Sequence, residues 1–144
     1  MSIWFEPVPS IKSLNAKQVN TLAEHLDMKI TRITDNSLTM SMPVDSRTTQ
    51  LHGRLHGGAS VALAETVGSI AANLALDTNQ QAGVGLEINA NHIRPIKEGV
   101  VFATATAEAL GRTTQVWSIR ITDSDDGLIC ISRFTVAVIS AVRA

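Results

Sequence analysis

The sequence predicts an α+β fold in which a long antiparallel sheet curves around one thin helix. The chain has 144 residues, of which 44% are hydrophobic and 17% charged, so it can build one domain-sized core over residues 1–144. An almost uninterrupted apolar run rich in Ala and Gly predicts a slender buried helix over 58–76. Long runs with β-like alternation follow this helix, and the short loops between them favour antiparallel pairing.

The N-terminal part of the chain predicts an amphipathic helix over residues 14–26. Asn15 can cap this helix, and Gln18 stands at the position from which a side chain reaches back to the cap. The apolar side of the predicted helix has i, i+3, i+4, i+7 spacing and consists of Val19, Leu22, Ala23 and Leu26.

The remaining elements are predicted as strands separated by turn signals. Residues 28–34 and 37–44 alternate around Asp35-Asn36, which predicts a hairpin, and a polar loop with glycines then leads into the long helix. After that helix we expect four strands, within residues 84–94, 100–111, 113–123 and 127–140. One face of the last strand is expected to hold Leu128, Cys130, Ser132, Phe134, Val136 and Val138.

The composition argues against several classes of function. The formal net charge is −1, and the chain has no tyrosine and few other aromatic residues, so it lacks the basic surface and stacking platforms of a nucleic-acid-binding protein. The single Cys130 excludes an intrachain disulfide framework, and the N-terminus shows no signal-peptide pattern, so we expect a cytoplasmic protein. The apolar run over 58–76 could span a bilayer in length, but its polar residues and missing flanking anchors argue against a membrane helix.

Glu65 is the residue of the predicted long helix that most needs an explanation. It is the only charged side chain between His56 and Leu76, and an ionised carboxylate removed from water costs several kcal/mol unless it is paired. A structural explanation would pair it with an arginine far away in the sequence. The functional explanation is a carboxylate held in a dry site as a general base or nucleophile.

Four stretches of the chain resemble a known family. They are MPVDSRT at 42–48, LHGGASVALAETVGS at 55–69, GLEINANH at 85–92 and GRTTQVWSIRI at 111–121. On these motifs the chain resembles the hotdog-fold acyl-CoA thioesterases, in the branch related to the 4-hydroxybenzoyl-CoA and phenylacetate-pathway enzymes. Within that branch it is most similar to hydrolases of 1,4-dihydroxy-2-naphthoyl-CoA in menaquinone biosynthesis and to enterobactin proofreading thioesterases.

This resemblance implies hydrolysis of an acyl-CoA thioester, with an aryl acyl group expected, to a free acid and CoA. Coenzyme A, or an acyl carrier domain in its place, would be part of the substrate, with no further cofactor. The assembly would be a homodimer or a dimer-of-dimers tetramer. Two alternatives are an acyl-thioester hydratase or dehydratase, which typically has a Pro-rich segment near its histidine that LHGRLHGGAS lacks, and a non-catalytic acyl-CoA-binding protein.

Five residues are expected to carry the chemistry. The resemblance implies that Glu65 attacks the thioester carbonyl or activates water, and that Gln50 and His56 contact the thioester region. Gly57 stands at the helix start, where unpaired N–H groups can bind an oxyanion. Ser69 lies one helical turn after Glu65 on the same face. The structural alternatives are a helix-packing serine, a glycine needed only for a turn, a loop-anchoring histidine and a solvated glutamine.

The substrate-binding residues are expected on an edge strand and around a turn. Gly85 would let a pantetheine arm lie against the backbone of the edge strand, and Arg94, Arg112 and Lys97 could meet the CoA phosphates. Ordinary surface charge is the alternative for these three cations. The full set of predicted binding residues is Gly85, His92, Ile93, Arg94, Pro95, Ala109, Leu110, Gly111, Arg112, Thr113 and Thr114.

Helix geometry predicts that two chains share each site. Glu65 follows Gly57 by eight residues, which is about 12 Å along a helix axis, whereas both must lie within about 3 Å of one thioester group. A two-fold dimer would let Gln50, His56 and Gly57 of one chain meet Glu65 and Ser69 of the other. A competing zinc site at His52 and His56 is disfavoured, because the glycines around them oppose a helix and no third ligand is near.

Overall fold

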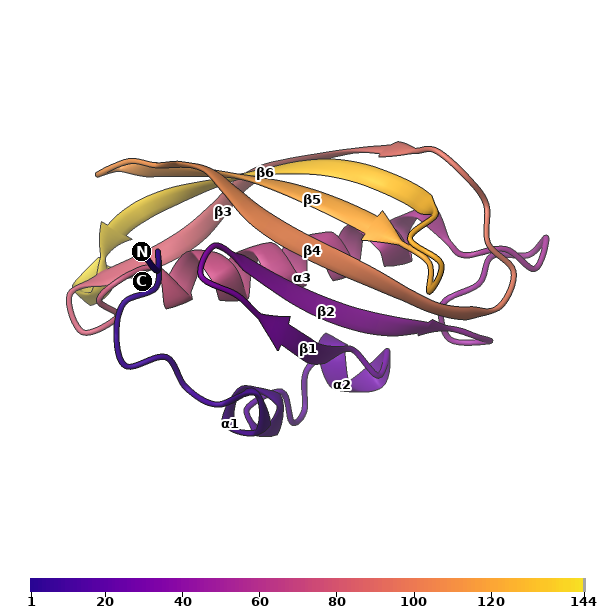
Figure 1. The fold of residues 1–144 in the computed structure, drawn as a ribbon, viewed down its shortest axis with the longest axis horizontal. Helices are drawn as coiled ribbons and strands as arrows, with labels where there is room; N and C mark the ends of the chain where they lie inside the picture. The colour runs from indigo at the N-terminus through magenta and orange to yellow at the C-terminus, as the bar shows by residue number, and fades with distance from the viewer. Residues whose placement is uncertain (144) are drawn as a thin grey trace.

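A computed structural model describes residues 1–143 of the chain, and its strands form one antiparallel sheet in the order β1-β2-β4-β5-β6-β3. Figure 1 shows this sheet curving around the long helix α3. The elements are α1 (Ile11–Ala16), α2 (Leu22–His25), β1 (Lys29–Ile33), β2 (Ser37–Val44), α3 (Gly57–Leu74), β3 (Gln81–His92), β4 (Gly99–Leu110), β5 (Thr114–Thr122), β6 (Leu128–Ser140) and the short 3₁₀ helix η1 (Ala141–Arg143). The predicted α+β fold, the hairpin, the long helix and the four later strands are confirmed.

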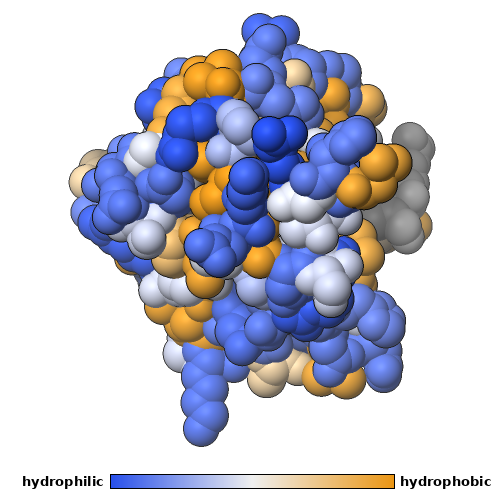
Figure 2. Space-filling model, turned by 90° about the vertical axis from the view of Figure 1, so that its right-hand side faces the viewer, coloured by the Kyte–Doolittle hydropathy of each residue, from blue (hydrophilic) through white to orange (hydrophobic). Residues whose placement is uncertain are grey.

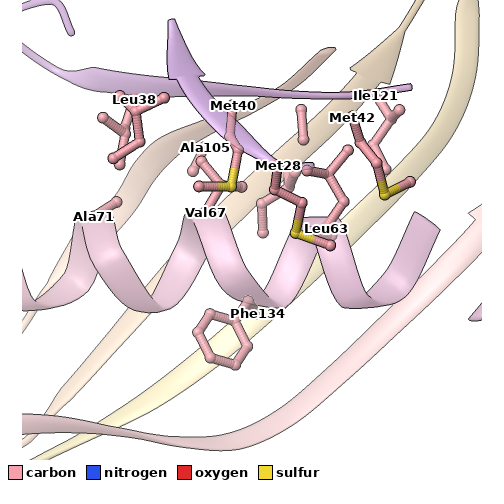
Figure 3. Close-up of a cluster of buried hydrophobic side chains, with 14 of the residues drawn as sticks. Met28, Leu38, Met40, Met42, Leu63, Val67, Ala71, Ala105, Ile121 and Phe134 are labelled. Atoms are coloured by element: carbon pink, nitrogen blue, oxygen red, sulfur yellow. The ribbon is translucent and has the colours of Figure 1, made fainter. Parts of the chain in front are cut away.

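Small residues along α3 let the sheet approach the helix from two sides. Figure 3 shows Val67 directed toward Met40 of β2 and Leu63 beside Met28, while Phe134 of β6 lies on the opposite side of the helix. A side-chain carbon on Gly68 would lie 2.7 Å from Cδ1 of Phe134, so this contact requires a glycine. Among the described residues, no helix is long and apolar enough to cross a membrane.

Alternation within the strands follows the predicted pattern. Every second residue of β2 is buried, from Leu38 to Val44, and the expected face of β6 places Cys130, Ser132, Phe134 and Val136 in the interior. Burial raises the pKa of the Cys130 thiol.

The predicted helix over 14–26 is wrong, because this segment forms two short helices. Asn15 does not cap a helix; its side chain binds the backbone N–H and C=O of Ile30 at 2.8 and 3.0 Å. Asn20 has a φ of 60°, which ends helical geometry between α1 and α2. Ser10 and Thr21 are the actual N-caps. Val19 is consequently 59% exposed, although the spacing predicted that it faces the core.

The first ten residues form a fixed strap across one end of the sheet. The N–H of Ile3 donates to Asp35 O at 2.9 Å, and the N–H of Phe5 donates to Leu74 O at 2.8 Å. Trp4 donates from Nε1 to Thr34 O at 2.6 Å and stacks on Trp117, with ring centroids 6.1 Å apart and planes 8° from parallel. These contacts hold the strap against the C-terminal half of α3.

The two edges of the sheet differ in how they are protected. β1 has only five residues, which discourages further strand pairing. β3 has 12 residues and pairs only with β6 among the strands described. Leu86 and Val84 on this strand are 64% and 43% exposed. A long, apolar and uncovered edge is typical of an association surface.

Candidate active site

His56 fixes the start of α3. It is the N-cap residue, and its Nδ1 accepts a 2.8 Å hydrogen bond from the N–H of Gly58. A neutral imidazole that accepts at Nδ1 carries its proton on Nε2, which leaves one donor free. The N–H of Gly57 has no acceptor among the described residues. The helix therefore begins with a free backbone donor beside an imidazole, which is the arrangement expected for an oxyanion site.

A cavity of about 230 Å³ brings several predicted residues together beside this helix start. A side-chain carbon on Gly57 would lie 2.9 Å from Nε2 of His92, so the end of β3 lies directly against the helix terminus. Figure 2 views the molecule from the end where the loop before α3 lies, and shows hydrophobic residues between mainly hydrophilic ones. The predicted residues that line the cavity are Gln50, His92, Ile93, Arg94 and Pro95.

The loop before α3 folds back on itself and adds a residue that the sequence did not single out. Thr49 and Leu55 form an isolated bridge, and the N–H of Gln50 donates to Arg54 O at 2.8 Å. Gly53 makes this reversal with a φ of 73°. Arg54 therefore lines the same cavity and forms no salt bridge with any residue of the described chain. Gly53 was the sequence signal for this chain reversal, but the composition of the loop indicated only a polar segment.

Gln50 is oriented within this loop. Its Oε1 accepts a hydrogen bond from the N–H of His52, which turns the amide nitrogen outward as a donor. Within the part of the chain that is described, no group of three or more His, Cys, Asp or Glu side chains is placed to hold a metal ion.

Glu65 is exposed in the single chain, so the expectation that one chain buries this carboxylate in a dry site is wrong. Its Oε1 lies 3.2 Å from the position that a side-chain carbon on Gly85 would occupy, which places the carboxylate over the middle of β3. No residue between 1 and 143 forms a salt bridge with it. The ion-pair explanation therefore has no support within one chain.

Ser69 lies one turn beyond Glu65 and faces a different space. It borders a cavity of about 540 Å³ between α3 and the N-terminal residues. The alternative of a hydroxyl bonded back to the helix is not observed for Ser69, whereas Thr66 makes such a bond to Ala62 O at 2.6 Å. Within residues 1–143 the Ser69 hydroxyl has no hydrogen-bond partner.

The predicted phosphate-binding residues do not come together in one chain. Arg94 stands at the end of β3 where Ile93 bonds Ile129, and it forms a salt bridge with Asp123. The guanidinium of Arg94 lowers the pKa of the Asp123 carboxyl. Arg112 stands in the β4–β5 turn, where Thr113 O accepts from the N–H of Val138 near the opposite end of β6.

The turn residues form a separate surface at that opposite end. A cavity of about 500 Å³ is lined there by Arg112 and Thr113 together with Asp77, Gln80 and Gln81. Gly111 is required by the turn itself, because a side-chain carbon would lie 2.8 Å from Thr114 O. The expected positions Ala109, Leu110 and Thr114 are all exposed at the same end.

A long helix held against a curved six-stranded antiparallel sheet defines the hotdog fold, and the free helix-start donor and the unpaired helix carboxylate suit the chemistry of a thioester hydrolase. The chain belongs to the thioesterase superfamily, whose model matches residues 52–130. It is 44% identical over 137 residues to the 1,4-dihydroxy-2-naphthoyl-CoA hydrolase of Escherichia coli, covering 95% of this chain and 99% of that one.

Two further similarities agree with this assignment. The proofreading thioesterase EntH of Cronobacter turicensis is 46% identical over 129 residues, covering 90% of this chain and 93% of that one. The crystal structure of a mutant of thioesterase PA1618 from Pseudomonas aeruginosa superposes with a TM-score of 0.94 at 50% identity, covering 96% and 99% of the two chains. The predicted family and enzyme class are therefore confirmed.

Proposed function

We propose that this protein hydrolyses aryl-CoA thioesters, with 1,4-dihydroxy-2-naphthoyl-CoA as the model substrate, and that it needs no cofactor. The observation that carries this proposal is that two polar groups of α3 have no partner among the described residues. They are the Gly57 N–H at the start of the helix and the Glu65 carboxylate on its exposed side. The first suits a thioester oxyanion and the second a general base or nucleophile. The hydrolase of E. coli named above supports an aryl-CoA substrate.

Two copies of the chain would complete each site. Gly57 and Glu65 are about 12 Å apart along one helix axis, which is too far for both to act on one carbonyl. The uncovered edge of β3 supplies a surface for a two-fold partner, since antiparallel pairing of two such edges would bury Leu86 and Val84. The same partner would cover Glu65, which restores the dry surroundings expected for a poised carboxylate.

The chemistry itself fixes the register of this pairing. Glu65 lies over Gly85, and Gly57 lies against His92. To bring Glu65 of one chain to the helix start of the other, position 85 of one β3 must lie near position 92 of the other. The two-fold axis then passes close to Ile88 and Asn89. In this arrangement the turn with Arg112 of one chain would lie beside the β3 end with Arg94 of the other chain. Both arginines could then contact the phosphates of the same CoA, as predicted.

The proposed reaction uses these groups in sequence. Gln50, His56 and Gly57 of one chain hold the thioester, with the Gly57 N–H donating to the carbonyl oxygen as it gains charge. Glu65 of the other chain takes a proton from water, whose oxygen adds to the carbonyl carbon. The carbon–sulfur bond then breaks, and the proton passes from Glu65 to the thiolate of CoA. Direct attack by Glu65 through an acyl anhydride is the second form of the same chemistry.

Glu65→Gln is the direct test of this function. We expect it to fold normally and to lose about 10²–10⁴ in kcat on aryl-CoA substrates. Glu108→Gln is the matched control, since Glu108 is exposed on β4 and makes no salt bridge among the described residues. A folded Glu65→Gln protein with kcat close to wild type would refute the assignment.

Subunit mixing tests the shared site. Glu65→Ala and Gln50→Ala proteins, each nearly inactive, are unfolded together and refolded. Random pairing makes half of the dimers mixed, and each mixed dimer has one intact site, so activity should return to about a quarter of wild type. Mixed dimers that are seen by mass spectrometry but remain inactive would show that each chain holds its own complete site.

A further inference from the structure

The largest of the cavities described above lies beside Ser69, outside the proposed reaction centre. It has a volume of about 540 Å³ and is enclosed by the N-terminal part of the chain on one side and the second half of α3 on the other. Phe5, Pro7 and Leu14 contribute apolar surface from the N-terminal side, and Ile70 contributes it from the helix. We call this space the strap cavity, after the strap formed by residues 1–10.

The strap cavity continues toward the reaction centre along α3. A neighbouring cavity of about 360 Å³ shares Leu14, Lys17 and Ile70 with it and reaches back to Thr66, the residue after Glu65. Ser69, one turn beyond Glu65, lines the strap cavity, and Thr66 and Ile70 line its neighbour. A group attached to a carbonyl near Glu65 can reach the strap cavity at Ser69, which lies one helical turn further on.

Some of the polar groups at the strap cavity already have hydrogen-bond partners within the chain. The Asn73 amide bonds Ser69 O and both backbone groups of Gly83, at 2.9–3.2 Å. The Asp77 carboxylate accepts from the N–H of Asn79 and from the Gln80 amide. Four groups have no partner among the described residues: the Ser69 and Thr78 hydroxyls, the Asn79 side-chain amide and the Lys17 ammonium. Apolar side chains form one part of this lining and polar side chains the other, which suits an apolar group that carries polar substituents.

The distance between Glu65 and the strap cavity determines how large an acyl group must be to enter the cavity. Ser69 lies about 6 Å further along the helix axis and Asn73 about 12 Å. An acetyl or propionyl group ends before Ser69, whereas a bicyclic aryl group or a medium-length alkyl chain extends into the cavity. The opposite wall is held in place, because the strap is bonded to Asp35 and Leu74 and locked by the stacked pair Trp4 and Trp117.

We propose that the strap cavity binds the distal part of the acyl group, and that residues 5–17 set the acyl selectivity of the enzyme. This inference rests on the proposed function, because it takes the thioester carbonyl to lie beside Glu65. It assigns a substrate-recognition role to a segment outside the motifs that identify the family. The ligand class is an aryl or medium-chain acyl group of at least six carbons.

The test compares two lysine substitutions on the same short helix. Lys17→Trp adds bulk at a position that lines both cavities, whereas Lys12→Trp adds the same bulk at an exposed position that lines neither. The readout is the ratio of kcat/KM for octanoyl-CoA to that for propionyl-CoA. We expect the ratio to fall at least tenfold in Lys17→Trp and to stay within twofold of wild type in Lys12→Trp, since filling an apolar pocket discriminates by roughly that amount.

Phe5→Ala provides the opposite perturbation. Phe5 is 51% exposed, so its truncation leaves the core intact and enlarges the strap cavity. We therefore expect kcat/KM for acyl chains longer than octanoyl to rise relative to kcat/KM for octanoyl-CoA. Unchanged ratios in folded Lys17→Trp and Phe5→Ala would overturn the proposal. If Lys17→Trp does not fold, Phe5→Ala alone decides.

A binding measurement separates this proposal from the proposed function. Non-hydrolysable thioether analogues with octyl and ethyl groups in place of the acyl chain report affinity without turnover. If Glu65→Gln keeps full activity, the catalytic assignment fails, yet a tenfold drop in the octyl-to-ethyl affinity ratio in Lys17→Trp still supports the strap cavity. If the octyl-to-ethyl affinity ratio is unchanged in Lys17→Trp while Glu65→Gln is inactive, the cavity proposal is refuted and the catalytic assignment is supported.

Discussion

Gly57→Ala should separate activity from stability at the helix start. The added methyl carbon would lie 2.9 Å from Nε2 and 3.2 Å from Cε1 of His92, which is closer than such atoms pack. His92 is exposed, so its ring can move aside with little loss of folding free energy. Alanine at the first position of a helix is itself tolerated. We therefore expect the free energy of unfolding to change by less than about 1 kcal/mol.

The same methyl group should nevertheless damage catalysis. It occupies the space between the Gly57 backbone and His92, where the thioester carbonyl must approach to within about 3 Å of the N–H. The N–H of residue 57 remains in this variant, but the methyl group keeps the carbonyl from reaching it. Loss of one oxyanion hydrogen bond lowers kcat by about 10²–10³ in hydrolases, and we expect a drop within that range here.

Gly68→Ala is the informative comparison, measured by thermal melting and by steady-state kinetics. Its methyl carbon would lie 2.7 Å from buried Phe134, so we expect a loss of about 1–3 kcal/mol in stability. A folded Gly57→Ala protein with kcat within twofold of wild type would refute the oxyanion role of Gly57.

Two further predictions concern charged residues in the β4–β5 turn and directly after β5. Arg112→Ala should raise KM for CoA esters more than for pantetheine esters, because only CoA carries the nucleotide phosphates, and added salt should narrow the difference; equal effects on both would place Arg112 outside the phosphate site. Asp123→Asn should lower the melting temperature at neutral pH, because Arg94 keeps the pKa of Asp123 below its ordinary 3.8. A lowered pKa stabilises the fold above pH 3.8 and loses that effect as pH falls through the lowered value, so wild type and variant should converge in acid; a constant difference across this range would exclude the ion pair as the cause.

The elements that the sequence predicts correctly are those whose pattern is local. The Ala- and Gly-rich run, the hairpin around Asp35-Asn36 and the alternating strands each show their partner-facing side within a few residues. The helix over 14–26 failed because Asn15 binds Ile30, which lies 15 residues away and cannot be inferred from local spacing. The salt bridge of Arg94 could not be inferred from local spacing either, since its partner Asp123 is 29 residues distant.

The candidate site likewise contains features that the local sequence predicts and features that it does not. The His56 cap and the position of Gly57 follow from the helix start, which the motif marks. The exposure of Glu65 could not be read from an apolar helix, because the sequence shows that the surroundings are hydrophobic but not which chain supplies them. Arg54 was missed because only the reversal at Gly53 carries it into the cavity.

The stacked pair Trp4 and Trp117 gives the molecule a built-in optical reporter. These are the two tryptophans of the chain, and both belong to the contact that fixes the strap. Their fluorescence and near-ultraviolet circular dichroism therefore follow the undocking of the N-terminal residues before they follow loss of the sheet. Local opening at this wall and global unfolding thus become distinguishable in one spectrum, without any label attached to the protein.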